Sequence, residues 1–287
     1  MKNKLILFIL LFSASEMALA QIALPSPSSA GKVYAKVGLT DVEINYSRPK
    51  MKGRLIYGEG DDYLVPFGKI WRTGANSGTI ITTDKDLSVE GSNLPAGEYM
   101  IITIPGKDAW QVIFYKDTSL GGNMANHKQE NEQLRVSVKP TKLTEAVQTM
   151  TFNISDLSED NTKAAIELAW ENTSVKIGIA TDFDKEVMAD IANKTKVSPN
   201  NYAAAANYYY NNGKDLDQAI EWMTLAIEAR PNAFWNIHTK AQMQAKKGDT
   251  KGALATAGES LAKAKAADSD FGYIKQNEDL IAELNKK

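Results

Sequence analysis

The chain has 287 residues, of which 43% are hydrophobic and 24% are charged, and its formal net charge is −2. This length suggests two domains, each with its own core, and the charge balance excludes a generally basic nucleic-acid-binding protein. The chain has no cysteine, which excludes disulfides, zinc–cysteine centres, iron–sulfur clusters and thiol catalysis.

The first 20 residues have the layout of a secretory signal peptide. Lys2 and Lys4 precede the apolar run LILFILLF at residues 5–12, and small residues surround a cleavage point after Ala20. The apolar run is short compared with the ~20 residues needed to cross a bilayer. Gln21, in place of a cysteine, excludes lipoprotein acylation. We therefore expect a cleaved signal peptide, no membrane anchor after cleavage, and an exported mature chain that is periplasmic or secreted.

After a linker at residues 21–30, residues 31–180 alternate apolar and polar side chains with a period of two, as in DVEINYS at residues 41–47. Turn sequences rich in proline, glycine and asparagine separate the alternating segments. Many short strands without helical patterns between them predict an all-β antiparallel sandwich, of jelly-roll or immunoglobulin-like type. The later strands are expected at residues 79–83, 87–90, 98–104, 110–115, 134–139, 148–154, 165–170 and 176–179, the last two forming a final hairpin.

The period changes to that of helices at residue 181. Residues 181–199 are predicted to form a linking helix, and residues 200–287 an alanine-rich all-α domain. In this domain small residues recur at a spacing of 34, as in Ala219 and Ala253. The pattern resembles the tetratricopeptide repeat, whose unit is a pair of antiparallel helices. The resemblance covers about residues 200–267 and implies that the end of the chain forms a capping helix.

Three sequence blocks mark the β half: SRPKMKGR at residues 47–54, VPFGKIWRTGAN at 65–76 and LPAGEYMIITIPGKDAW at 94–110. Together they resemble a bacterial family of exported proteins known only as a domain of unknown function. In that family the blocks occur in this order, often behind a signal peptide and sometimes ahead of tetratricopeptide repeats. The resemblance spans roughly residues 24–180. It implies a β-sandwich domain with no established activity, and it carries over no functional residues.

The long segment at residues 47–79 concentrates arginine, aromatic and glycine residues. A connection this long in a compact domain is either functional or disordered, and its apolar content argues against disorder. The candidate ligand-binding residues are Arg48, Arg54, Trp71, Arg72 and Asn76. Arginine binds carboxylates and phosphates with paired hydrogen bonds, and a tryptophan face stacks on sugar rings. In the structural alternative, the arginines bind carbonyl groups that hold the loop to the sheet, and Trp71 belongs to the core.

A second set of candidates comes from matching the helical half to the tetratricopeptide pattern. The inner face, where such repeats commonly hold extended peptides, is assigned Asn201, Tyr208, Asn211, Trp235, His238 and Gln242. A protein or peptide partner is one interpretation of these residues. The other is that the helices pack against the β domain.

Two classes of function remain open. The first is a noncatalytic exported protein that binds an anionic or sugar ligand on its β domain and serves as a protein scaffold through its helices. The second is a cell-envelope hydrolase that holds an anionic or carbohydrate substrate in the Arg/Asn/Trp loop. The sequence favours the first class, because no Ser/His/Asp or Cys/His arrangement is evident.

Motifs for metals and cofactors are missing from the sequence. His127 and His238 are the only histidines and fall in different halves, which excludes a multi-histidine metal site within one chain. No Gly-rich phosphate loop precedes a helix, and no Gly-x-Ser-x-Gly elbow occurs. We expect no metal, no cofactor and no nucleic-acid partner.

Overall fold

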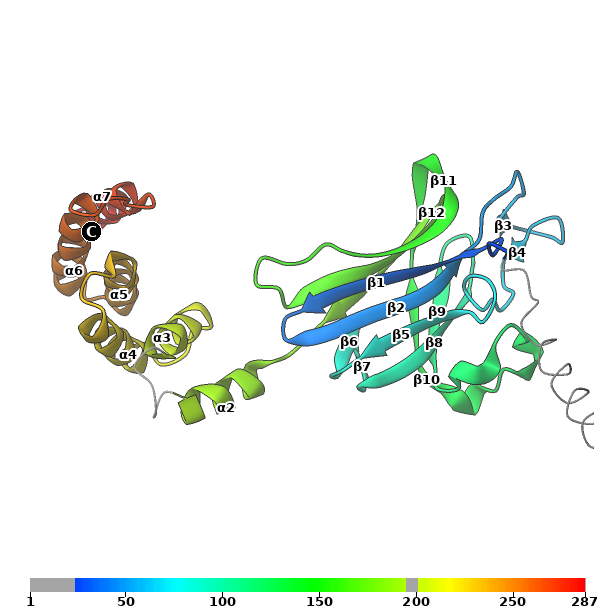
Figure 1. Ribbon diagram of the computed structural model, residues 1–287, viewed down its shortest axis with the longest axis horizontal. Coiled ribbons are helices and arrows are strands. Elements are labelled where there is room, and N and C mark those ends of the chain that lie inside the picture. The colour runs from blue at the N-terminus through cyan, green and yellow to red at the C-terminus, as the bar shows by residue number, and fades with distance from the viewer. Residues whose placement is uncertain (1–23, 195–200, 287) are drawn as a thin grey trace, which may run out of the picture. The chain divides into compact units, whose positions relative to one another are not determined.

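The computed structural model describes residues 24–194 and 201–286 (Figure 1). The predicted signal peptide lies outside the described residues. The chain divides into two compact units, and the boundary falls between Asp182 and Phe183. The first unit is built of strands and the second of helices, as the change of hydrophobic period predicts.

Two antiparallel sheets make up most of the first unit (Figure 1). The larger sheet has the strand order β1 (Ser29–Val37), β2 (Thr40–Arg48), β5 (Thr79–Thr83), β8 (Gly97–Ile104), β9 (Trp110–Tyr115) and β10 (Glu132–Val138). The smaller sheet has the order β11 (Pro140–Ser155), β12 (Lys163–Ala180), β6 (Leu87–Val89) and β7 (Ser92–Leu94). Two short parallel strands, β3 (Tyr57–Gly58) and β4 (Val65–Pro66), lie in the long connection between β2 and β5.

The two main sheets share one hydrophobic core, which confirms the predicted all-β sandwich. The alternation in β2 directs Val42 and Ile44 into this core, and β12 contributes Ile166 and Leu168 from the other sheet. Trp170, from β12, is among the largest fully buried side chains. Burying apolar area from both sheets at once is what makes this arrangement stable.

The larger sheet is covered on its outer face as well. Residues of β8 and β9 that point away from the shared core, among them Met100, Ile113 and Tyr115, form a second buried cluster with Leu120 and Met124. These last two belong to three short 3-10 turns between β9 and β10, at Thr118–Leu120, Met124–Asn126 and Gln129–Asn131. Burial on both faces explains why the central strands are almost continuously apolar.

The predicted final hairpin is wrong. Residues 163–180 form one continuous strand, β12, which pairs with β11 up to Val175 and with β6 at Ile179 and Ala180. The polar sequence ENTS at residues 171–174, where the prediction placed the turn, lies opposite an irregularity in β11. Glu171 has a φ of 54° there, so the strand bends locally without reversing direction.

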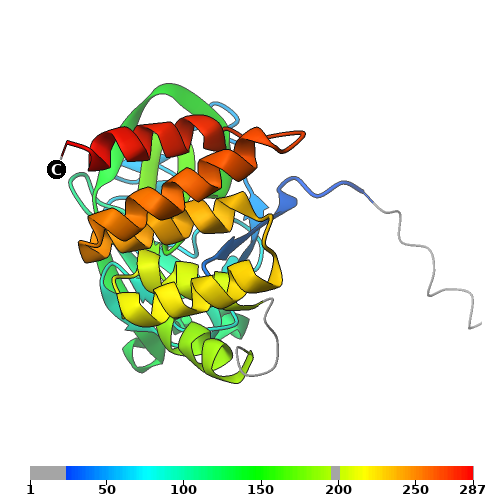
Figure 2. The ribbon, with the colours of Figure 1, turned by 90° about the vertical axis from the view of Figure 1, so that its left-hand side faces the viewer.

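Six helices form the described part of the second unit: α2 (Asp184–Lys194), α3 (Tyr202–Asn211), α4 (Leu216–Ala229), α5 (Phe234–Lys247), α6 (Thr250–Lys265) and α7 (Tyr273–Leu284). From α3 onward each helix packs against the next, and α5 also contacts α3 and α7 (Figure 2). Small buried residues such as Ala206 and Ala219 allow close approach. The side chains of Asp215 and Asp249 cap the first turns of α4 and α6. The predicted linking helix corresponds to α2, and its last expected residues lie outside the described ones.

Candidate functional site

Three tryptophan side chains gather around Tyr57, which lies in the long connection between β2 and β5. The Tyr57 ring meets the rings of Trp71, Trp110 and Trp170 edge-on, with centroids 5.9, 4.9 and 6.0 Å away. Trp71 and Trp170 stack on each other at 6.0 Å. Trp110 belongs to β9 and Trp170 to β12, so the cluster fastens the long connection to both sheets. Each such ring pair contributes about 0.5–1.5 kcal/mol beyond the area it buries.

The hydroxyl of Tyr57 lies in this cluster without a hydrogen-bond partner among the described residues. The residue is 8% exposed, and burial, together with the negative charge of Glu171, raises the pKa of Tyr57 well above 10.0. The phenol is therefore neutral at physiological pH and available as a donor. A buried hydroxyl without a partner costs about 1–3 kcal/mol, so its presence needs a reason.

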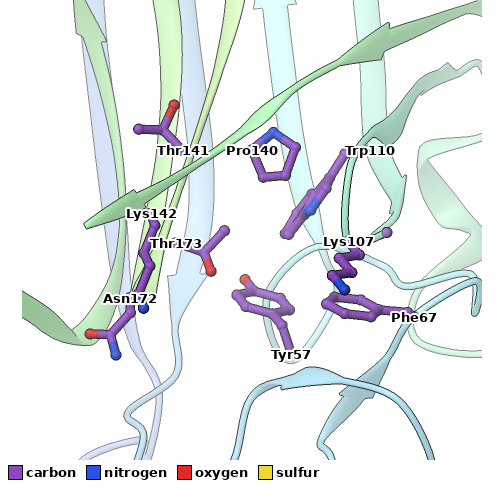
Figure 3. A pocket seen from close by; sticks show the side chains of 10 residues that line it. Tyr57, Phe67, Lys107, Trp110, Pro140, Thr141, Lys142, Asn172 and Thr173 are labelled. Atoms are coloured by element: carbon purple, nitrogen blue, oxygen red, sulfur yellow. The ribbon is translucent and has the colours of Figure 1, made fainter. Parts of the chain in front are cut away.

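A cleft of about 260 Å³ opens beside this hydroxyl (Figure 3). Its walls include the aromatic rings of Tyr57, Phe67 and Trp110, and its polar residues include Lys107 and Lys142. Figure 3 shows the Tyr57 hydroxyl directed into the cleft, with Lys142 on one side of the ring and Lys107 on the other. An aromatic floor with a few convergent polar groups is the usual composition of a small-molecule site.

The irregularity in β11 builds one wall of the cleft. Lys142 pairs with Thr173 and Val147 with Glu171, so β11 advances five residues while β12 advances two. The extra residues bend β11 away from its partner, and the intervening Asn172 lines the cleft beside Lys142.

Glu171 joins this wall to the residue before Tyr57. Its Oε1 accepts a hydrogen bond of 3.2 Å from the backbone N–H of Ile56. Glu171 itself has a positive φ, an uncommon conformation for a residue with a side chain. The strand that carries Asn172 and the strand that carries Tyr57 are therefore held in a fixed relation.

Two of the predicted arginines bind the protein itself. The Nε of Arg48 donates to the carbonyl of Met150 at 3.4 Å, and its Nη2 donates to the hydroxyl of Thr151 at 3.1 Å. These bonds connect β2 of the larger sheet to β11 of the smaller one. Arg54 is exposed and donates to the carbonyls of Met51 and Lys50, at 3.0 and 2.7 Å, within its own turn. Arg48 therefore matches the structural alternative, whereas the bonds of Arg54 stay within its own turn.

Arg72 and Asn76 lie elsewhere, beside Gly122 in the connection between β9 and β10. The Nε of Arg72 is buried without a partner among the described residues. The Nδ2 of Asn76 donates to the hydroxyl of Ser47 at 3.0 Å and holds the end of β2. Trp71 belongs to the aromatic cluster behind the cleft. None of the five predicted residues is among those that line the cleft beside Tyr57.

The residues that do line the cleft come from four distant segments. Tyr57, Lys107, Lys142 and Asn172 lie in β3, the turn between β8 and β9, β11 and β12. No sequence motif with a fixed spacing relates these residues, so the sequence alone could not predict that they line one cleft. One signal was available, because the second and third sequence blocks contribute Phe67, Lys107 and Trp110 to the same cleft.

The β unit with its cleft matches a known family. A family model described as a protein of unknown function (DUF2911) covers residues 28–179. The chain belongs to this family. No match was found among the curated proteins, and none among the solved structures. The DUF2911 match ends before α2, so the helical unit lies outside it.

The candidate partner residues of the helical unit differ in exposure. Trp235 is 39% exposed and Asn211 is exposed, whereas Gln242 is half-buried. Two others are occupied within the unit, because the Nδ2 of Asn201 donates to the carbonyl of Lys194 at 3.2 Å and the Tyr208 hydroxyl donates to Asp184 at 2.5 Å.

His238 lies inside the helical unit and is 4% exposed. Its Nδ1 is 2.8 Å from the Oδ1 of Asn277. The Nδ2 of Asn277 donates to the hydroxyl of Ser260, and that hydroxyl donates to the carbonyl of Phe234. This buried network joins α5, α6 and α7 and keeps the His238 side chain inside the unit.

The described residues contain no group of three or more His, Cys, Asp or Glu side chains placed to hold a metal ion. None of the helices in the described part of the chain is long and apolar enough to cross a membrane.

Proposed function

We propose that this DUF2911 protein is an exported, noncatalytic binding protein whose β domain holds a small ligand in the cleft beside Tyr57. The observation that carries the proposal is the buried Tyr57 hydroxyl, which is directed into the cleft and has no partner in the described chain. A ligand acceptor at this point would offset its desolvation. Lys107 and Lys142 favour an anionic ligand.

The cleft favours binding over hydrolysis. Among the described residues that line it there is no Asp, Glu or His. Glycoside hydrolysis commonly needs two carboxylates about 5–10 Å apart across the scissile bond, and ester or amide hydrolysis needs an activated nucleophile with a base. The wall residues offer hydrogen-bond donors and ring faces, which suit recognition.

Calorimetric titration of the purified protein against anions, sugars and peptides tests the proposal. We expect at least one ligand to bind the wild type and to bind Tyr57→Phe at least tenfold more weakly, since the variant keeps the ring but loses the donor. Tyr99→Phe is the matched control, because the Tyr99 hydroxyl donates to the Pro95 carbonyl at 3.0 Å and does not line the cleft. No binding across the whole series, or equal binding by Tyr57→Phe, would contradict the proposal.

Export and a helical partner complete the proposal. The signal-peptide layout of the first 20 residues supports export, and N-terminal sequencing of the protein from its native cells is expected to start at Gln21.

The exposed Trp235 and the serial packing of α3 to α7 support a tetratricopeptide-like unit that holds a peptide. A peptide that binds is expected to change the tryptophan fluorescence and to lose affinity in Trp235→Ala.

A further inference from the structure

The polar side chains around the cleft can all donate hydrogen bonds. The Tyr57 hydroxyl is a neutral donor, Lys107 and Lys142 carry ammonium groups, and Asn172 and Thr173 add an amide and a hydroxyl. In the part of the chain that the structure describes, neither lysine forms an ion pair. The cleft therefore matches a ligand rich in acceptor oxygens and carrying negative charge.

The two lysines stand on different sides of the ring. Figure 3 shows Lys142 next to Asn172 on one side of Tyr57 and Lys107 next to Phe67 on the other. A single compact anion at one lysine would leave the second without a charge to bind. Two anionic groups on either side of a flat ring would use both.

The walls favour a ring. Phe67 is half-buried and presents aromatic surface to the cleft beside the edge of Tyr57, which is 8% exposed, and the buried Trp110 backs them. Inorganic phosphate would leave that surface without a contact. A simple aromatic carboxylate would cover the rings but remove water from Asn172 and Thr173 without replacing its hydrogen bonds, which is costly. A sugar ring has an apolar C–H face for the aromatic walls and hydroxyls for the polar groups.

We propose that the cleft binds an acidic saccharide, in which a pyranose ring lies against the aromatic wall and carboxylates on neighbouring sugars reach Lys107 and Lys142. This inference rests on the proposed binding function and names the ligand class for the same site. The Tyr57 hydroxyl donates to an oxygen of the central ring. Because two sugars carry the charges, affinity rises from the monomer to the trimer.

The test is calorimetry of the purified protein with galacturonate monomer and trimer, a neutral galactose trimer, and inorganic phosphate. We expect the acidic trimer to bind at least tenfold more tightly than the acidic monomer or the neutral trimer, and its affinity to fall as salt rises. Lys142→Met is expected to weaken the acidic trimer about tenfold and to leave the neutral trimer unchanged. Lys116→Met is the matched control, because Lys116 is exposed and follows β9 at the end away from Trp110.

The outcomes separate the inference from the proposed function. Equal binding of the acidic and neutral trimers, or binding of phosphate alone, would overturn the acidic-saccharide inference while a Tyr57-dependent ligand would keep the binding function. An equal loss of affinity in Lys142→Met and Lys116→Met would also overturn it, because the lysine effect would then be a general charge effect. If no ligand of any class binds, both fail.

Discussion

Tyr57 packs its ring against three tryptophan rings, and the described chain gives its neutral hydroxyl no hydrogen-bond partner. Removing that hydroxyl is expected to stabilise the ligand-free protein. We predict that Tyr57→Phe raises the free energy of unfolding by about 1 kcal/mol, because the phenylalanine has no polar group to desolvate. Urea unfolding of the β unit, followed by tryptophan fluorescence, measures this change.

The control for this prediction is again Tyr99→Phe. Its hydroxyl has a carbonyl partner, so its removal is expected to lower the free energy of unfolding by about 1 kcal/mol. If Tyr57→Phe also lowered it, the Tyr57 hydroxyl would have a partner in the free protein, such as an ordered water. The argument for a ligand at this point would then fail.

Asp160 shows how a short loop gains stability from one carboxylate. Its Oδ1 accepts hydrogen bonds from the Ser158 hydroxyl and from the backbone N–H and hydroxyl of Thr162. These bonds, that of Ser158 first, lower the pKa of Asp160 from 3.8 to about 2. Because the folded pKa is the lower one, the stabilisation is complete above about pH 4 and is lost as the pH falls towards 2.

We therefore predict that the Asp160 carboxyl titrates near pH 2, which NMR of its side-chain carbon would measure directly. Ser158→Ala is expected to move that titration upward. A wild-type carboxyl that titrates near 3.8 would show that the loop bonds do not persist in solution.

At the scale of elements, the turn before β5 depends on a glycine. Gly78 has a φ of 95°, and a Cβ placed on it would overlap the terminal methyl of Met100 in β8, which is fully buried, and would lie 3.2 Å from the backbone carbonyl of Arg72. We predict that Gly78→Ala lowers the free energy of unfolding by about 2–4 kcal/mol, combining the positive φ with overpacking.

Gly91→Ala separates these two causes. Gly91 also has a positive φ, of 82°, but no atom lies within 4 Å of its added Cβ. Gly91→Ala is expected to lower the free energy of unfolding by about 1 kcal/mol. Equal costs for the two alanine variants, measured by urea unfolding, would mean that the contact with Met100 adds nothing.

Elements with clear ends could be predicted from the sequence. The predicted bounds of β5 and β9 agree with the structure, because each is a short run rich in apolar and β-branched residues that ends at a charged residue, Asp84 or Lys116. The continuity of β12 could not be predicted, because Asn172 and Thr173 are common turn residues. In the structure they stay in a strand because β11 supplies the irregularity opposite them.

The cleft was harder to predict than the strands. The arginines of residues 47–79 were predicted to bind a ligand, yet Arg48 and Arg54 donate hydrogen bonds to nearby carbonyls. Nothing in the sequence distinguishes Lys107 and Lys142 from ordinary solvated lysines. Only the folded sheets bring both of them to the same cleft. Side chains that meet only through tertiary structure leave no pattern in a single sequence.

At the scale of the whole molecule, the two units have separate cores. The buried cluster of the sandwich contains residues of the β unit, and another contains residues of α3, α4 and α5. We therefore expect a defect in one unit to leave the other folded. Asn277→Ala removes the shared partner of His238 and Ser260 and is predicted to lower the stability of the helical unit by about 1–3 kcal/mol.

Hydrogen exchange followed by mass spectrometry tests this separation. Peptides from residues 201–286 are expected to exchange faster in Asn277→Ala, while those from residues 24–182 stay as in the wild type. Gln276→Ala, exposed on the same helix, is the control and is expected to change the stability by less than about 0.5 kcal/mol. Faster exchange in both units would show that they unfold together.

The continuous strand β12 also has a mechanical consequence. It is an interior strand, with β11 on one side and β6 on the other, and it ends at Ala180, just before the unit boundary. A pulling force that reaches the β unit from the helices would act along β12. Such a force loads many interstrand hydrogen bonds in parallel instead of opening them one at a time. The sandwich would therefore resist tension from its C-terminal side far better than a unit joined through an edge strand.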